Sequence, residues 1–228
     1  MTPPQIRFVD LRSPTPAAFW TSRALRHPFF AWAGLRPPFA QHTLAEHQVL
    51  EKFARGRTNI VEIGVAEGAS AVALRTAMDP AGTLYLVDSF HLSRVPALNF
   101  LRRAAHRAVS AGPGPQTVWI EDFSQNAVRQ WTRPIDFLLI DGDHRESAVE
   151  QDWNDWSPHL VDHGLVAFHD ARLFHNGWTS PGYGPVRFVD RFFRNNPSSP
   201  WIILHEVDSL VVVSRKGRFS YIFPAGCP

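Results

Sequence analysis

The chain alternates between short, almost wholly apolar runs and longer segments in which apolar residues recur with a helical period. The apolar runs predict strands at five places, 59–63, 83–87, 116–120, 135–140 and 165–168. Continuous apolar runs of this length, bounded by turn residues, are typical of strands buried on both faces of a parallel sheet. The periodic segments between them predict helices at about 70–77, 97–109, 124–131 and 147–156. The pattern therefore predicts five βα units.

Further elements lie on either side of these units. Residues 43–46 form a capping box, in which threonine and glutamate side chains satisfy the free amides of a helix start. This helix is expected to end near Ala54. Towards the C-terminus, 185–195 is expected to be helical, and 201–207 with 210–215 predicts an antiparallel hairpin.

Parallel strands joined by helices imply an open sheet covered on both faces. The terminal hairpin is unlike an ordinary dinucleotide-binding fold, which continues with parallel strands. The architecture resembles that of class I S-adenosylmethionine-dependent methyltransferases. The resemblance implies an α/β, Rossmann-like, doubly wound sheet of seven strands in the order 3-2-1-4-5-7-6, with strand 7 antiparallel.

Two segments lie outside this regular pattern. Residues 1–40 are rich in proline, phenylalanine and tryptophan without a sustained period, and predict an irregular N-terminal arm over the core, against a partner subunit, or both. The expected catalytic domain then spans 41–228. Within it, 171–184 is too rich in glycine, proline and aromatic residues to form a regular element, and predicts a lid or substrate loop.

A glycine-containing turn follows the first predicted strand. As a dinucleotide-binding fingerprint it fails, because Ala66 and Ala69 stand where the second and third glycines belong. The spacing of Glu62, Gly64 and Gly68 instead resembles the first motif of class I methyltransferases. In those enzymes the strand-end acid and the glycine loop hold the methionine part of the cofactor S-adenosylmethionine.

Acidic residues end the next two strands. Asp88 suits the paired hydroxyls of a ribose. Asp122, beside Phe123, follows the third strand, where this fold usually holds adenine: the acid can accept the exocyclic amino group while the ring covers the base. Plainer interpretations exist, since both aspartates could be helix N-caps and Glu121 could replace Asp122. Their strand-end order favours a cofactor site.

The fourth and fifth strands also end in polar residues. Asp141 follows one of them, and His169 with Asp170 follows the other. Adjacent parallel strands lie ~4.8 Å apart, so these side chains could share one ion. Carboxylates suit Mg²⁺, whereas an imidazole ligand shifts the preference towards Mn²⁺, Fe²⁺ or Zn²⁺. Asp141 is also expected to reach the cofactor.

The segments IDGDH and AFHDA resemble the metal-dependent O-methyltransferases that act on sugars in natural products, the macrocin and mycinamicin type. In those relatives an aspartate after strand four and an acidic pair after strand five hold Mg²⁺, and a nearby histidine takes the proton of a sugar hydroxyl. The resemblance implies these metal-binding roles for Asp141 and Asp170 and the proton-accepting role for His144. His169 departs from the family's acid, and is expected to ligate through nitrogen, contact substrate or leave the metal with fewer protein ligands.

The acceptor implied by this resemblance is a sugar or oligosaccharide, or a glycosylated natural product. The overall sequence also resembles actinobacterial methyltransferases that cap methylmannose polysaccharide precursors, which suggests a mannoside. In the expected lid loop, the aromatic side chains of His175, Trp178 and Tyr183 are weaker candidates for stacking on a sugar face, or else they pack down.

Other functions also fit parts of the pattern. A catechol or phenol O-methyltransferase would use the same metal geometry. An Fe²⁺ oxygenase could combine His144 and His169 with one carboxylate, but that leaves the glycine loop and Asp88 without a role. In a non-catalytic cofactor-binding module the polar strand ends would be structural, with His144 bonded to a backbone carbonyl.

Composition narrows the classes of partner. The chain has 228 residues, 44% hydrophobic and 19% charged, as in an ordinary globular domain. A formal charge of +2 with scattered arginines gives no case for nucleic acid. Neither a membrane span of ~18 apolar residues nor a signal-peptide pattern is present. The single cysteine, Cys227, excludes an intrachain disulfide framework. These features predict a cytoplasmic protein, and the aromatic arm is consistent with a homodimer.

Overall fold

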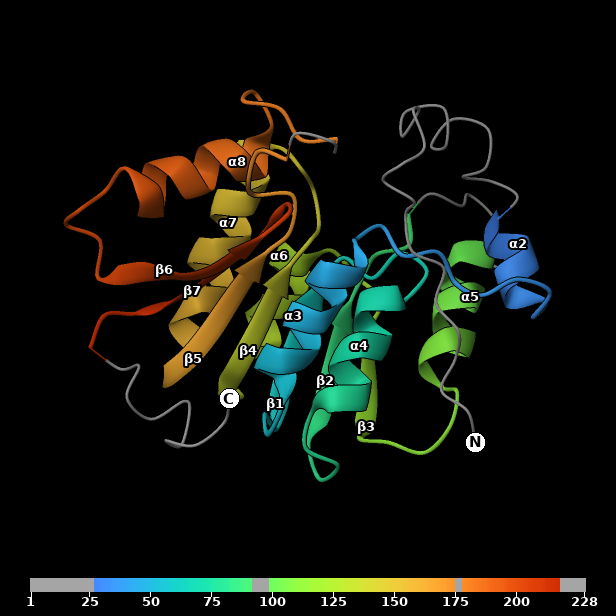
Figure 1. Ribbon diagram of the computed structural model, residues 1–228. Helices are drawn as coiled ribbons and strands as arrows, with labels where there is room; N and C mark the ends of the chain where they lie inside the picture. Colours follow the sequence, from blue (N-terminus) through green and yellow to red (C-terminus); the bar gives the residue numbers. More distant parts are fainter. Residues whose placement is uncertain (1–26, 92–98, 175–177, 218–228) are drawn as a thin grey trace.

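The computed structural model describes residues 27–91, 99–174 and 178–217. Within them, seven strands form one sheet in the order β3-β2-β1-β4-β5-β7-β6 (Figure 1). β7 runs antiparallel to both of its neighbours. The predicted Rossmann-like α/β sheet and its strand order are therefore confirmed. The strands are β1 (Asn59–Ile63), β2 (Thr83–Val87), β3 (Gln116–Ile120), β4 (Ile135–Ile140), β5 (Leu160–Phe168), β6 (Trp201–Val207) and β7 (Leu210–Arg215).

Helices cover both faces of the sheet. The helices are α2 (His27–Trp32), α3 (Leu44–Ala54), α4 (Ala69–Ala77), α5 (Phe100–Val109), α6 (Ser124–Ala127), α7 (Glu146–Trp156) and α8 (Gly184–Val189), which a π-helical turn, Asp190–Arg194, extends. The first hydrophobic cluster packs α3, α4 and α5 against one face, and the second packs α7 and α8 against the other. Figure 1 shows these two helical layers with the sheet between them.

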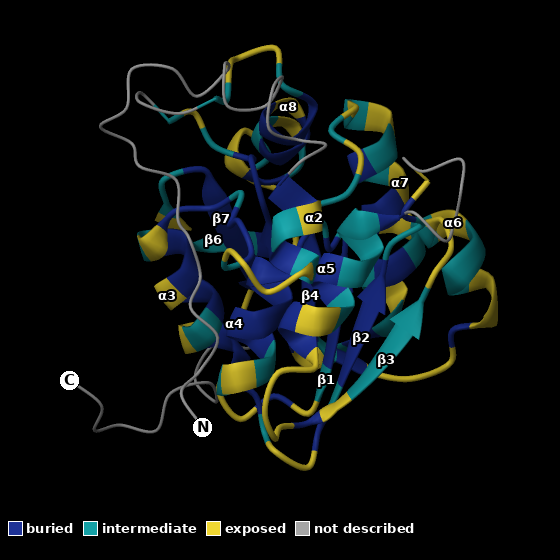
Figure 2. Ribbon diagram, turned by 90° about the vertical axis from the view of Figure 1, so that its right-hand side faces the viewer, coloured by how far each residue is buried: buried dark blue, intermediate teal, exposed yellow. Residues whose placement is uncertain are grey.

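Strand β4 shows why the apolar runs are continuous. Phe137 and Leu139 belong to the cluster beneath α3, α4 and α5, while Leu138 and Ile140 belong to the cluster beneath α7 and α8. Both faces of the strand are therefore buried, and an alternating polar pattern is absent from it. The edge strand β3 is only partly buried, as Figure 2 shows.

The structure differs from the sequence prediction at two elements. β5 begins at Leu160, five residues before the predicted start at Leu165, because the exposed polar residues Asp162 and His163 interrupt its apolar run. In the arm predicted to be irregular, residues 27–32 form helix α2, and the Phe29 ring lies 5.1 Å from that of Phe100 on α5. A helix of six residues is too short for a period to be recognised.

The rest of the predicted arm, residues 1–26, lies outside the described residues. Among the helices that the structure does describe, none is long and apolar enough to cross a membrane.

Candidate active site

The loops that follow β1, β2, β3 and β4 surround a cavity of about 610 Å³. Its wall includes Gly64, Asp88, Phe123, Asp141 and His144, one or more from each loop. Ligands of open α/β sheets bind outside the carboxyl ends of the strands, and the cavity lies at this position. The cofactor residues predicted after four different strands are thus largely brought to one place.

The two predicted glycines allow neighbouring segments of the chain to approach each other closely. A Cβ on Gly64 would lie 2.1 Å from the backbone oxygen of Asp141, and its φ is 85°. A Cβ on Gly68 would lie 3.1 Å from Val109 Cγ2 on α5, and its φ is 84°. Between them, Ala66 lines the cavity with a φ of 49°, a left-handed conformation unusual for alanine. The glycines therefore shape the loop, which in turn forms the wall.

Replacing Gly64 with alanine is expected to lower the free energy of unfolding by about 3 kcal/mol. A left-handed non-glycine residue costs about 1–2 kcal/mol, and the contact with a backbone oxygen adds a packing cost of similar size. Gly56→Ala is the matched control, because Gly56 has a φ of 71° but no atom within 4 Å of the added carbon. Urea denaturation compares the two. Equal losses would show that the approach to Asp141 is not a constraint.

Glu62 lies beneath the glycine loop and is not part of the cavity wall. It is fully buried and accepts a hydrogen bond from Ser70 Oγ on α4. Burial raises the pKa of Glu62 well above its ordinary value. In the structure Glu62 joins β1 to α4, and its predicted contact with a cofactor stays a prediction.

Asp88 holds two loops at the centre of the cavity wall. Its Oδ2 accepts hydrogen bonds from Val65 N at 2.9 Å and Ala66 N at 3.2 Å, and its Oδ1 accepts one from Phe90 N at 2.8 Å. A carboxylate offers about four acceptor positions. One position therefore remains for a hydroxyl group such as that of a ribose.

Asp122 and Phe123 both line the cavity, at the end near β3. Asp122 is exposed, and its Oδ1 accepts hydrogen bonds from Asn126 Nδ2 and Phe123 N. These two bonds lower the pKa of Asp122 and fix its side chain just before α6, whose N-cap residue is Phe123. The Phe123 side chain is 46% exposed, and its ring lies 5.7 Å from that of His91. Two aromatic rings thus stand at this end of the cavity.

The N-terminal segment supplies a further wall that the sequence analysis did not identify. His27, Phe39 and Gln41 line the cavity. Glu67 in the glycine loop holds this segment, since its Oε2 lies 2.9 Å from His27 Nδ1 and accepts a hydrogen bond from Phe39 N at 2.9 Å. An ion pair between the arm and a loop has no short sequence signal, because the two partners lie 40 residues apart.

Three side chains from the ends of β4 and β5 converge beside the cavity. His144 Nε2 lies 3.1 Å from Asp170 Oδ2 and 3.8 Å from Asp141 Oδ1. One donor atom from each of the three residues lies within 4.8 Å of the others. His144 Nε2 is enclosed and has no aligned hydrogen-bond partner in the described part of the chain. Two carboxylates and one free imidazole nitrogen fit a divalent cation.

The surrounding residues hold the Asp170 side chain beside His144. Its φ of 54° is left-handed, which a non-glycine residue keeps only when its surroundings hold it there. Its Oδ1 accepts hydrogen bonds from Trp178 Nε1 and, at 3.1 Å, from Ser209 Oγ. Burial disfavours the charged carboxylate, but His169 and His144 outweigh it and lower the pKa of Asp170. The indole of Trp178 therefore supports the acid, which sequence alone did not indicate.

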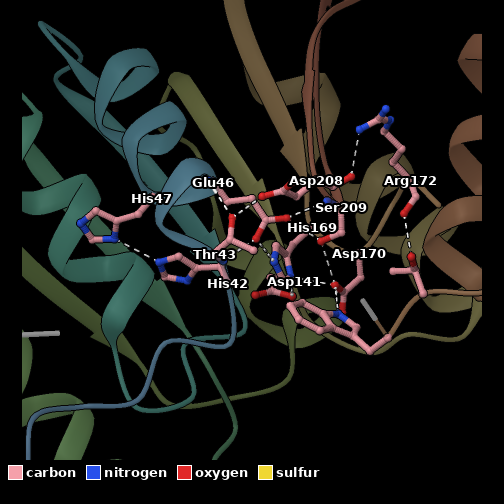
Figure 3. A network of polar contacts seen from close by, with 12 residues as sticks. His42, Thr43, Glu46, His47, Asp141, His169, Asp170, Arg172, Asp208 and Ser209 are labelled. Carbon is pink, nitrogen blue, oxygen red and sulfur yellow. Dashed lines mark hydrogen bonds and ion pairs between the residues drawn. The ribbon is translucent and has the colours of Figure 1, made fainter. Parts of the chain in front are cut away.

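His169 lies among three carboxylates, as Figure 3 shows. Its Nδ1 is 3.1 Å from Asp141 Oδ1 and 3.4 Å from Asp170 Oδ1, and its Nε2 is 3.4 Å from Glu46 Oε2. Burial opposes its charge, but these acids raise the pKa of His169 well above its ordinary value. The structure places His169 as an internal cation beside the group of donors, not within it. Its predicted metal ligation is not tested and stays a prediction.

Glu46 joins α3 to this cluster. It completes the predicted capping box by accepting a hydrogen bond from Thr43 N at 2.7 Å. Its Oε1 also accepts 2.7 Å bonds from both N and Oγ of Ser209, in the turn between β6 and β7 (Figure 3). Burial alone would raise its pKa, but His169 outweighs that effect and lowers the pKa of Glu46 to about 2. The capping box already accounted for this glutamate, so its tertiary role had no separate signal.

Of the three weaker substrate candidates, Tyr183 lies at the site. Its ring is 5.2 Å from that of His144. Burial, together with the charges of Asp170 and Asp141, raises the pKa of Tyr183 to about 12. His175 lies outside the described residues. The expected lid ends at Tyr183, because α8 begins at Gly184.

The donor group bears on the oxygenase alternative. A facial triad for Fe²⁺ needs two histidines and one carboxylate. Within the described residues, the group that could hold an ion has one histidine and two carboxylates. The second histidine, His169, has both ring nitrogens directed at acids. The geometry therefore does not favour an oxygenase.

A protein-family model described as a methyltransferase domain matches residues 61–171, which span β1 to the end of β5 and include the cluster of acids and histidines. Over these residues the chain is similar to a methyltransferase domain. The match ends directly after Asp170, so it covers both strand ends that form the candidate catalytic cluster.

Solved structures with this methyltransferase fold resemble the chain over most of its length. Cofactor-bound Rv0187 from MTB has a TM-score of 0.63 at 14% identity, over 90% of this chain and 99% of that one. An O-methyltransferase from Bacillus cereus in complex with SAH has a TM-score of 0.58 at 15% identity, over 86% and 92%. The O-methyltransferase TomG from Streptomyces achromogenes, involved in tomaymycin synthesis and in complex with SAM, has 0.55 at 18%, over 86% and 91%. At these identities the likeness is one of fold.

Proposed function

We propose that the protein transfers the methyl group of S-adenosylmethionine to a hydroxyl oxygen of a sugar or oligosaccharide, such as a mannoside, or of a glycosylated natural product. One observation carries this proposal: His144 lies between two carboxylates, Asp141 and Asp170, on the wall of a cavity large enough for a nucleoside cofactor. The methyltransferase domain and the SAM- and SAH-bound O-methyltransferases of the same fold support it.

The cofactor would lie across the carboxyl ends of the strands. Asp88 has one acceptor position left for the ribose, and the exposed ring of Phe123 can cover the adenine. The loop from Gly64 to Glu67 would hold the methionine part, on the same cavity wall as Asp141 and His144.

Methyl transfer requires an oxygen nucleophile in line with the sulfonium, so positioning and proton removal account for most of the catalysis. S-adenosylmethionine, when bound, would supply the methyl group to the acceptor oxygen, and S-adenosylhomocysteine would be the product released. The hydroxyl proton passes to His144 Nε2, the enclosed nitrogen that has no aligned partner among the described residues. Asp170, 3.1 Å away, stabilises the imidazolium that forms.

A divalent cation, Mg²⁺ or Mn²⁺, would be held by Asp141 and Asp170, whose oxygens lie within reach of one another. Such a cation lowers the pKa of an alcohol and orients it. The chain's own contribution is to fix the two carboxylates: His169 directs Asp141, and Trp178 with Ser209 directs Asp170. His169 would therefore be a positioning residue that orients Asp141.

The acceptor would meet aromatic side chains at the outer side of the site. The Tyr183 ring lies beside His144, and the indole of Trp178 lies beside Asp170. Flat rings of this kind suit the apolar faces of sugars. We propose a small molecule or oligosaccharide as the partner, in a cytoplasmic setting, and not nucleic acid or a membrane. A homodimer stays a prediction.

The test is a calorimetric titration with S-adenosylmethionine in the presence of Mg²⁺ and then of chelator, followed by methyl transfer to a panel of sugars and phenols. We expect the cofactor to bind with or without the cation. We expect transfer to be abolished by chelator and restored by Mg²⁺ or Mn²⁺. Absence of cofactor binding would overturn the proposal, and transfer to catechols alone would replace the sugar by a phenol as acceptor.

A further inference from the structure

Helix α7 presents to the cavity a buried carboxylate that the proposed chemistry does not use. Asp152 lines the cavity together with Ala148 and Gln151. These residues have the spacing of one helical face, so this face of α7 is directed at the cavity. Asp152 is only 5% exposed. Aspartate is seldom buried to this degree without a partner for its charge.

The contacts of Asp152 leave one of its oxygens free. Its Oδ1 accepts a hydrogen bond from Ser124 Oγ, at the start of α6. In the part of the chain that the structure describes, Oδ2 accepts none. A Cβ built on Gly142 would lie 3.5 Å from Oδ2, so this oxygen reaches the loop after β4 that forms the cavity wall. Oδ2 is open to the cavity and has no partner among the described residues, so a donor on a bound ligand can complete it.

The charges around Asp152 agree with this interpretation. Burial, followed by the neighbouring Asp155 and Asp143, raises the pKa of Asp152 to about 6. No cation pairs with it among the described residues. A hydrogen-bond donor on a ligand would therefore relieve both the missing partner and part of the cost of the buried charge.

The surroundings of Asp152 suit a purine. Ser124 and Gln125 line the cavity beside it, and the ring of Phe123 stands on the same short helix start. Asp122, the acid predicted from sequence to accept the adenine amino group, is exposed, and its Oδ1 already accepts two bonds. Asp122 is therefore an exposed residue bonded within its own segment, whereas Asp152 is enclosed.

We propose that Asp152, positioned by Ser124, accepts a hydrogen bond from the exocyclic amino group of the cofactor's adenine and makes the site specific for a 6-amino purine. The inference rests on the proposed cofactor. A 6-oxo purine would place an oxygen against the carboxylate, where neither group can donate while the acid is ionised. The site therefore rejects hypoxanthine by leaving a buried acceptor unpaired.

The experiment measures binding of S-adenosylhomocysteine and of its deaminated analogue S-inosylhomocysteine by calorimetry at pH 7.5. For the unmodified protein we expect a preference of about 100-fold for the amino form, the size associated with an unpaired buried acceptor. Asp152→Asn keeps the shape of the side chain but can turn a donor towards a 6-oxo group. In this variant we expect the preference to fall below about threefold.

Two further variants sharpen the result. Asp122→Asn is the matched control and is expected to keep the full preference, because Asp122 is exposed and its Oδ1 is bonded within its own segment. Ser124→Ala removes the group that orients Asp152 and is expected to reduce the preference to an intermediate value. If Asp152→Asn and the unmodified protein discriminate equally, or if Asp122→Asn loses the preference, the inference is wrong. If the unmodified protein binds neither compound, the proposed function itself fails.

Discussion

Replacement of His144 by alanine is expected to lower kcat by about 10²–10⁴-fold, the usual contribution of a general base. The acceptor hydroxyl would lose the group that takes its proton, while Asp141 and Asp170 would stay in place. Asp170 keeps its bonds to Trp178 and Ser209 in the variant, so the fold should be retained. Affinity for S-adenosylmethionine is expected to change by less than about threefold, since binding energy and chemistry are separable in such variants.

The measurement pairs steady-state turnover with a calorimetric titration of the cofactor. His163→Ala is the matched control: it removes another histidine, but an exposed one in the early part of β5, whose backbone oxygen accepts a hydrogen bond from Arg57 Nη1 and is kept in the variant. We expect this control to keep normal turnover. Turnover that survives the loss of His144 would remove it from the mechanism.

Replacement of Glu46 by alanine is expected to lower the free energy of unfolding by about 3–5 kcal/mol, as when one partner of a buried ion pair is removed. The variant leaves the His169 imidazolium facing one acid fewer. It also removes the acceptor for the backbone amides of Thr43 and Ser209. These groups are enclosed, so water would satisfy them poorly.

Urea denaturation of three variants tests this prediction. Glu46→Gln keeps the shape and one acceptor oxygen but loses the charge, and an intermediate loss is expected. Glu51→Ala, one turn further along α3, removes a partly exposed acid that lies 3.6 Å from His47, and should change stability by less than about 0.5 kcal/mol. A loss below about 1 kcal/mol for Glu46→Ala would contradict the role of Glu46 as a central acceptor.

The difference in stability between the unmodified protein and Glu46→Gln is expected to depend on pH. The pKa of Glu46 is lowered to about 2 in the folded chain, below the value of about 4.3 for an unfolded glutamate. A lowered acid pKa contributes stability that is complete above the unfolded pKa and is lost as pH falls towards the folded one. The stability difference between the unmodified protein and Glu46→Gln should therefore be smaller near pH 3.5 than near pH 7. An unchanged difference would argue against the ionised form.

Much of the sheet follows from local pattern. The bounds of β1, β2, β3 and β4 agree with the apolar runs, because these strands are wholly or partly buried and are followed by a glycine or an acidic residue. The early part of β5 and helix α2 were not predicted. The first carries exposed residues inside a strand, and the second is stabilised by aromatic contacts with α5 that have no counterpart in its own six residues.

The residues of the candidate site also divide into those that the sequence could place and those that it could not. Asp141, His144 and Asp170 could be placed together from sequence, because carboxyl ends of adjacent parallel strands must meet at one edge of the sheet. The contacts of the two ring nitrogens of His169 could not be predicted in this way. Whether its nitrogens meet a metal, a substrate or acids depends on α3, whose Glu46 lies 123 residues away in the chain.

The sequence by itself determined most of the strands, the edge of the sheet at which the polar residues gather and the position of the glycine loop, whereas the strand order came from the resemblance to class I methyltransferases. The first three follow from short-range pattern and from the geometry that every parallel sheet shares. Only the tertiary structure decided which carboxylates are buried and which helix faces are directed at the cavity. Asp122 and Asp152 are the same residue type in the sequence. They differ in the structure, because packing leaves Asp122 exposed and encloses Asp152 beside the cavity.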